Sequence, residues 1–185
     1  PANGAENWTF TDSTQRYIAS PLNIEDTIYA PTAGDQLYAL DLKGNLKWTF
    51  TGEGPFWAQP VAQPGCSCIY LTSMNHYVYA VNTQDGSLNW QSDKLKGSVV
   101  GTPALDGQEH FYFGTFASEL LQGDPKTHSL DTLLTTEGWI WSGPALLGEQ
   151  LFFGDIENYT LSAACIMAYF YYSALYLRGR LRLEV

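Results

Sequence analysis

The sequence predicts an all-β protein, a β-propeller built from four-stranded antiparallel blades. The prediction rests on a repeat of about forty-one residues, on four short apolar runs in each repeat, and on turn residues between the runs. Four strands in about 40 residues, repeated along a chain, are typical of propeller blades. Solenoids of helical hairpins share the period, but they need apolar residues at i, i+3 and i+4, and the repeat region lacks that pattern.

The repeat is clearest at its prolines and at the aromatic residues that follow them. Pro21, Pro60, Pro103 and Pro144 are 39, 43 and 41 residues apart. Each is followed by a pair that ends in an aromatic residue: Ile28-Tyr29, Ile69-Tyr70, Phe111-Tyr112 and Leu151-Phe152. We therefore expect a domain over residues 1–163 with four blades at about residues 17–50, 57–91, 98–134 and 139–163.

The second repeat shows how each blade is built. Its four strands are expected at Trp57–Ala62, Cys68–Thr72, Tyr77–Val81 and Ser87–Gln91. Successive residues of such runs point to opposite faces of a sheet. Asp85-Gly86 is a strong hairpin signal, because glycine supplies the positive φ that a tight turn needs. The same turn-then-Trp ending recurs at Trp48 and Trp90 and is degraded in the last two repeats.

The runs Leu37–Asp41 and Val78–Asn82, each followed by a turn and a Trp, resemble the pyrroloquinoline-quinone-like (PQQ-like) propeller repeat. That repeat occurs in quinoprotein dehydrogenases and in cofactor-free relatives, including the outer-membrane assembly lipoprotein BamB. The resemblance covers about residues 8–163. It implies a wheel of seven or eight blades in which the closing-strand tryptophans, Trp48 and Trp90, dock between neighbouring blades.

Only four blades are present, which leaves two expected arrangements. The first is a partial wheel whose open blade edges invite self-association. The second is a closed four-bladed ring. Asn7–Phe10 nearly copies Lys47–Phe50, so Trp8 would dock on a blade as Trp48 does, and its strand would complete the fourth blade.

Residues 164–185 depart from the repeat and form an atypical apolar and basic tail. An uncharged run ends at Leu177 and is followed by Arg178, Arg180 and Arg182. Membrane contact by this tail is one interpretation, although the run outside the blade is short for a span. A packed closing strand or helix, or non-native sequence, are the others.

The motifs favour binding over catalysis. A PQQ dehydrogenase needs a calcium site of carboxylate and amide oxygens, and no loop gathers them. The family's enzymes also place two adjacent cysteines over the cofactor, whereas this chain has Cys66-Ser67-Cys68, which is expected to enter a strand without forming part of a disulfide framework. His76, His110 and His128 lie in or beside turns without a zinc or triad spacing. We therefore expect no catalytic residue, no metal and no cofactor, with PQQ and calcium as the alternative.

Trp57 and Trp141 are the candidate ligand-binding residues. Each lies three residues before the proline of its repeat, where the other repeats have Ile18 and Val100. Their strand is the innermost of the blade. The two tryptophans are thus expected either to pack between blades or to line the central channel and receive a ligand or peptide.

Charge narrows the class of partner. Nine basic residues stand against nineteen acidic ones, for a net charge of −10. So few cations disfavour nucleic acid as a partner. The first residues lack the basic and apolar pattern of a signal peptide, which fits a cytosolic protein or a mature secreted one. The expected function is a non-enzymatic scaffold that binds a protein, peptide or other ligand in the periplasm or outside the cell, with a PQQ dehydrogenase fragment as the alternative.

Overall fold

The computed structural model describes residues 3–62, 66–107, 110–148, 150–157 and 161–165, and their regular structure is entirely β. Blade 1 contains β1 (Leu22–Ile24), β2 (Thr27–Pro31), β3 (Gln36–Asp41) and β4 (Leu46–Thr51). Blade 2 contains β5 (Val61–Ala62), β6 (Cys68–Thr72), β7 (Val78–Asn82) and β8 (Leu88–Gln91). Blade 3 contains β9 (Ala104–Leu105), β10 (Phe111–Gly114), β11 (Glu119–Asp124) and β12 (Ser129–Thr135). Blade 4 contains β13 (Ala145–Leu147), β14 (Gln150–Gly154) and β15 (Leu161–Cys165).

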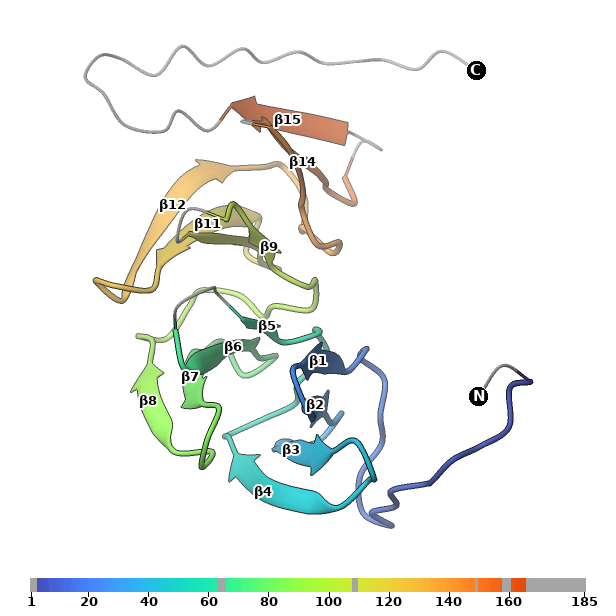
Figure 1. Cartoon of the computed structure of the whole chain (residues 1–185). Helices are drawn as coiled ribbons and strands as arrows, with labels where there is room; N and C mark the ends of the chain where they lie inside the picture. The colour runs from blue at the N-terminus through green and yellow to red at the C-terminus, as the bar shows by residue number, and fades with distance from the viewer. Residues whose placement is uncertain (1–2, 63–65, 108–109, 149, 158–160, 166–185) are drawn as a thin grey trace.

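Each blade is an antiparallel meander in which every strand pairs with the next one along the chain. The four sheets follow one another along an open arc, with blade 1 at one end and blade 4 at the other (Figure 1). The propeller prediction is confirmed, and the described part of the chain forms a partial wheel. The closed four-bladed ring is wrong for this structure, because the N-terminal segment lies beside blade 1 and β15 lies at the far end of the arc (Figure 1).

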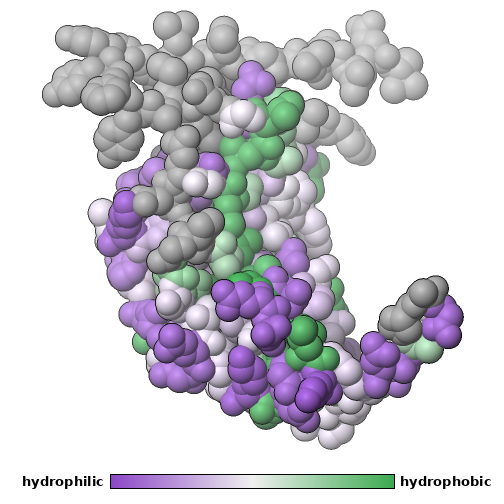
Figure 2. Space-filling view, viewed as in Figure 1, coloured by the Kyte–Doolittle hydropathy of each residue, from purple (hydrophilic) through white to green (hydrophobic). Residues whose placement is uncertain are grey.

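Apolar residues between neighbouring blades form the core. The junction of blades 1 and 2 buries Leu37 and Ala39 from β3 against Tyr79 and Val81 from β7. The other two junctions repeat this arrangement. Alternation along β3 and β7 explains it, since one face of each sheet meets the preceding blade and the other meets the following blade. On the side of the molecule shown in Figure 2, hydrophobic residues gather in a narrow band over blade 4 and its junction with blade 3.

The hairpin between the third and fourth strands of a blade needs a left-handed residue. Gly44 supplies it in blade 1 with φ 83°, and Gly86 supplies it in blade 2 with φ 74°. In blade 3 the corresponding residue is His128, with φ 59°. A side-chain oxygen accepts backbone N–H groups at the start of each turn. Asp41 accepts from Lys43 and Asn45 at 2.8 Å each, Asn82 accepts from Gln84 at 2.8 Å, and Asp124 accepts from Lys126 at 2.7 Å.

The structure differs from the sequence expectations in three places. The strand predicted at Trp57–Ala62 is reduced to Val61–Ala62, so Trp57 lies in the segment before β5. Blade 4 has three strands among the described residues. The predicted tail, residues 164–185, lies outside the described residues from residue 166 onward. Cys66 and Cys68 are joined by a disulfide, where the sequence predicted two small residues entering a strand.

Candidate binding site on the loop face

One face of the arc carries two kinds of loop, and we call it the loop face. The first kind is the hairpin between the second and third strands of each blade. The second is the connector, the segment that enters each blade from the one before. Phe56 N–H donates to the Thr32 carbonyl at 3.0 Å, Val99 N–H to Ser73 at 3.3 Å, and Ile140 N–H to Thr115 at 3.1 Å. Each connector therefore docks on the hairpin of the preceding blade.

The docked connectors decide where Trp57 and Trp141 point. Phe56 and Ile140, the residues just before them, are fully buried between blades. The connectors are extended, so the next side chain turns the opposite way. Trp57 is 39% exposed and Trp141 is 51% exposed. Burial of these two indoles between blades, one of the two sequence interpretations, is therefore not observed, although Trp141 contacts a ring of the blade 3 hairpin. The ligand-binding role stays a prediction.

Trp141 belongs to a stack of three aromatic rings. Phe116 lies in the blade 3 hairpin, with ring centroids 4.8 Å from Trp141 and 5.2 Å from Trp139. The interplanar angles of 29° and 14° make both contacts stacked. Trp139 and Trp141 are 48% and 51% exposed. We call these three residues the aromatic stack; it presents indole surface to solvent at the junction of blades 3 and 4.

The aromatic stack has acidic neighbours. Ile156 N–H donates to the Trp139 carbonyl at 3.0 Å, which holds the start of the blade 4 hairpin against the connector. Asp155 and Glu157 flank Ile156, and Glu137 precedes Trp139 by two residues. Glu137 and Glu157 are exposed. The loop face therefore combines exposed indoles with three carboxylates at this junction.

The surroundings of Asp155 disfavour the charged form of its carboxyl group. It follows β14 at the place that Thr32, Ser73 and Thr115 occupy in the other blades. Those hydroxyls donate to backbone carbonyls, whereas Asp155 Oδ1 is buried and accepts no hydrogen bond from the residues that the structure describes. Desolvation, with the charges of Glu137 and Glu157, raises the pKa of Asp155 above its ordinary value. A cation at this position would relieve both effects, because it favours the charged form of the carboxyl.

The sequence interpretation missed Trp139, Phe116 and Asp155. The Trp-x-Trp spacing of Trp139 and Trp141 places both rings on one side of an extended segment, so that pair was accessible from the sequence. Phe116 lies over twenty residues earlier on another blade, and only the fold brings it between them.

The tryptophans predicted to dock on blades lie on the edge of the arc. Trp8 Nε1 donates to the Leu42 carbonyl at 2.9 Å, and Trp48 Nε1 donates to the Thr83 carbonyl at 3.1 Å. Each indole covers the turn glycine of the blade, where a Cβ would fall 2.6 Å from the ring. Trp48 and Trp90 are half-buried, where full burial was expected. Trp90 stacks on His128 at 5.1 Å.

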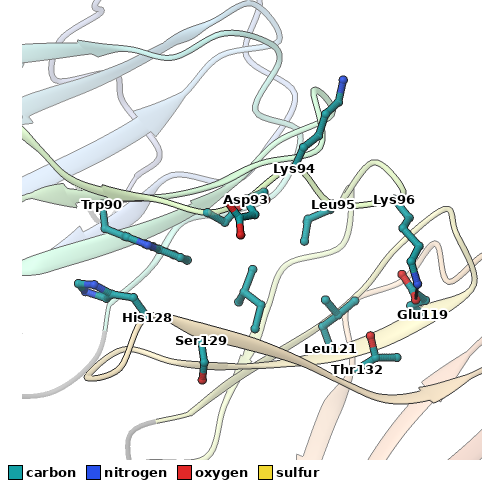
Figure 3. A pocket seen from close by; sticks show the side chains of 12 residues that line it. Trp90, Asp93, Lys94, Leu95, Lys96, Glu119, Leu121, His128, Ser129 and Thr132 are labelled. Carbon is teal, nitrogen blue, oxygen red and sulfur yellow. Dashed lines mark hydrogen bonds and ion pairs between the residues drawn. The ribbon is translucent and has the colours of Figure 1, made fainter.

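A groove of about 330 Å³ runs between β8 and β12, where Trp90 meets His128 (Figure 3). The Trp90–His128 pair lies at one end, and Lys96 with Glu119, joined at 2.5 Å, lies at the other. The turn of blade 3 has His128 at the position that Gly44 and Gly86 occupy in blades 1 and 2. Trp90 therefore stacks on the imidazole ring instead of lying directly over the turn backbone, and the groove lies beside this contact. It holds no cluster of nucleophile and base.

The described residues do not fit a metal-dependent cofactor. Among them, no group of three or more His, Cys, Asp or Glu side chains is placed to hold a metal ion. The cysteines are separated by Ser67 and joined to each other. His110 donates to or accepts from Asp106 at 3.0 Å, which engages it in a local turn contact. The described part of the chain contains no helix that is long and apolar enough to cross a membrane.

Comparison with known proteins agrees with the fold. The family described as "Outer membrane protein assembly factor BamB" matches residues 1–164. No curated protein sequence matches the chain significantly. The crystal structure of BamB from Moraxella catarrhalis is similar with a TM-score of 0.71 and 17% identity, over 86% of this chain and 51% of that one. The computationally designed Ika4 protein is similar with a TM-score of 0.75 and 11% identity, over 89% of this chain and 99% of that one. The chain thus spans about half the length of the BamB structure that it matches.

Proposed function

Because this chain belongs to the family of the outer membrane protein assembly factor BamB, with its PQQ-like propeller repeat, we propose that it is a non-enzymatic scaffold of the cell envelope. Its loop face binds a partner protein at the junction of blades 3 and 4. The aromatic stack receives a cationic side chain, lysine or arginine, from an extended segment of the partner. The observation that carries the proposal is the exposure of two stacked indoles beside three carboxylates.

The chemistry of the site favours a cation. The face of an indole carries negative potential and attracts ammonium and guanidinium groups, by about 0.5–2 kcal/mol according to how far the pair is desolvated. Carboxylates close by add Coulomb attraction. The raised pKa of Asp155 supports the same ligand class, since desolvation and the charges of Glu137 and Glu157 outweigh the backbone hydrogen bond from Glu157. Rigid blades hold the loops in place, as is usual for binding loops on a β scaffold.

The site is tested with a short synthetic peptide of alternating arginine and valine, titrated into the full chain while tryptophan fluorescence is followed. We expect Trp141→Ala to weaken binding about tenfold, since the cation–π contact contributes on the order of 1–2 kcal/mol. Trp57→Ala is the matched control, because Trp57 occupies the same connector position and stacks on no ring of the described residues, and it should leave the affinity unchanged. Equal losses in both variants, or equal binding of a glutamate-valine peptide, would refute the proposed site.

A location in the cell envelope is supported by the cysteines. Disulfides persist in oxidising compartments such as the bacterial periplasm. Cys66 and Cys68 are joined in this structure. Thiol trapping with an alkylating reagent in intact cells should find both cysteines protected until a reductant is added. Complete alkylation without reductant would place the chain in a reducing compartment.

The alternative, a fragment of a PQQ dehydrogenase, is tested directly. Incubation with calcium and the quinone, followed by absorbance and dye reduction, should show neither stoichiometric uptake nor turnover. Stoichiometric uptake of the quinone would favour the dehydrogenase fragment over the non-enzymatic scaffold.

A further inference from the structure

The N-terminal segment lies on blade 1 as the outer strand of a preceding blade would. Trp8 covers the turn of blade 1 and donates to Leu42, as Trp48 covers the turn of blade 2 and donates to Thr83. The aromatic residues two positions further along the chain also make equivalent contacts in the two blades. Phe10 packs 5.1 Å from Tyr38, and Phe50 packs 5.6 Å from Tyr79.

The match continues into the connector. Ala33 N–H donates to the Arg16 carbonyl at 2.7 Å, and Met74 N–H donates to the Pro55 carbonyl at 3.0 Å. Tyr17 lies 6.4 Å from Tyr38, as Phe56 lies 5.8 Å from Tyr79. Residues 8–17 therefore make on blade 1 the contacts that residues 48–56 make on blade 2. Among the described residues, the three inner strands that should accompany such an outer strand are missing.

Blade 4 shows the opposite arrangement of strands. Its sheet holds the three inner strands β13, β14 and β15, and the described residues contain no outer strand paired with β15. Within the described ranges, one end of the arc thus carries an outer strand without an inner sheet, and the other end carries an inner sheet without an outer strand.

The register of the complete blades predicts how these two parts would pair. In blade 1, Ala39 lies opposite both Tyr29 and Trp48. In blade 2, Ala80 lies opposite both Tyr70 and Trp90. In blade 4, Ala163 lies opposite Phe152, the residue that the repeat aligns with Tyr29. Trp8 would then face Ala163, and Thr9 would face Ser162, as Thr49 faces Tyr38.

We infer that residues 7–10 of one copy of the chain pair with β15 of a second copy, as its missing outer strand. The same copy cannot supply the strand, because the N-terminal segment and β15 lie at opposite ends of the arc (Figure 1). Two copies related by a two-fold axis each donate one segment and accept one, so both edges are satisfied in a closed dimer. Pairing would satisfy the backbone groups on the edge of β15 that pair with no other described strand, and unpaired edges of this kind invite association.

The register is tested by disulfide crosslinking in the full chain with Cys165→Ser, which leaves Cys66 and Cys68 paired with each other. Residues directly opposite in an antiparallel pair have Cα atoms about 4.5–5.5 Å apart, within the range of a disulfide. Thr9→Cys protein mixed with Ser162→Cys protein should therefore form a crosslinked heterodimer on mild oxidation. Thr9→Cys mixed with Ala163→Cys is the matched control, because successive residues of a strand point to opposite faces of the sheet, and its yield should be at least tenfold lower.

The protein with both Thr9→Cys and Ser162→Cys distinguishes the outcomes. Crosslinked dimers support the inference. A crosslink within one chain would overturn it in favour of a closed single-chain ring, and the absence of any crosslink would overturn it by showing that the edge of β15 is not accepting this strand.

A second measurement does not depend on added cysteines. Sedimentation equilibrium of the unaltered chain at micromolar concentration should give about twice 20.6 kDa. Thr9→Pro removes a backbone donor from the donated strand while Trp8 and Phe10 stay in place. It should raise the dimer dissociation constant at least tenfold without lowering the Tm of the monomer. A monomer of 20.6 kDa for the unaltered chain contradicts the inference.

Discussion

The connectors into blades 2 and 4 have the same backbone arrangement and different surfaces. In both, one side chain is buried at the junction with the preceding blade, and the side chain of the next residue, Trp57 or Trp141, is exposed to solvent. Trp57 stacks on no ring among the residues that the structure describes, whereas Trp141 stacks on Phe116. The repeat therefore fixes the position of a tryptophan, and the neighbouring residues decide whether it joins an aromatic stack.

The largest expected effect tests the part that the two connectors share. Phe56→Ala should cost about 3–5 kcal/mol of unfolding free energy and Ile140→Ala about 2–5 kcal/mol, since both side chains are fully buried between blades. Urea unfolding measures both. A loss below about 1 kcal/mol in either variant would show that this side chain is not packed between the blades, because removing a packed core side chain leaves a cavity.

A smaller effect is expected where the connector into blade 4 touches the one before it. A Cβ on Gly101 would lie 2.5 Å from the Gly143 nitrogen and 2.8 Å from the Ser142 carbonyl oxygen. Blade 2 has Ala58 at the corresponding position, two residues before its proline. Gly101→Ala should cost about 1–3 kcal/mol, as overpacking does.

Gly101→Ala should also shift the emission of the tryptophans in the stack, because the backbone that holds them must move. Thermal unfolding and fluorescence measure the two effects. An unchanged Tm with an unchanged emission spectrum would mean that the connectors are not in close contact.

Much of this arrangement was predictable from the sequence. The prolines and aromatic pairs located the blades, and Asp85-Gly86 located the hairpin of blade 2, since turn chemistry and alternation act locally. The choice between Trp57 and Phe56 as the buried residue was not predictable, because both are large and apolar and only docking on the Thr32 carbonyl orients them. The contact of Phe116 with Trp139 depends on two blades being adjacent, and no local pattern encodes it.

The smallest effect concerns the charge near the aromatic stack. The pKa of Asp155 is raised in the folded state, so the folded protein binds the proton more tightly and loses stability as pH rises through the window above the ordinary value of 3.8. Asp155→Asn should therefore raise the Tm at pH 7, and the gain should shrink as the pH falls below that window.

Asp85 is the control of opposite sign. Hydrogen bonds from the Ser87 backbone and hydroxyl lower its pKa. Its contribution is present at neutral pH and is lost on acidification, so Asp85→Asn should lower the Tm at pH 7 and have no effect in acid. Melting curves over pH 3 to 7 compare the two, and the same sign for both variants at pH 7 would disprove the assigned environments.

The cation site proposed at the junction of blades 3 and 4 is tested most directly by ¹H–¹⁵N spectra. In these spectra the indole N–H resonances report on each of the 6 tryptophans during titration with the arginine-valine peptide. We expect the Trp139 and Trp141 signals to shift in a saturable manner that about 1 M salt suppresses, since the Debye length there is about 3 Å, while the Trp57 signal stays unmoved. Shifts at Trp57 equal to those at Trp141, or no shift at either, would show that this junction is not a selective cation site.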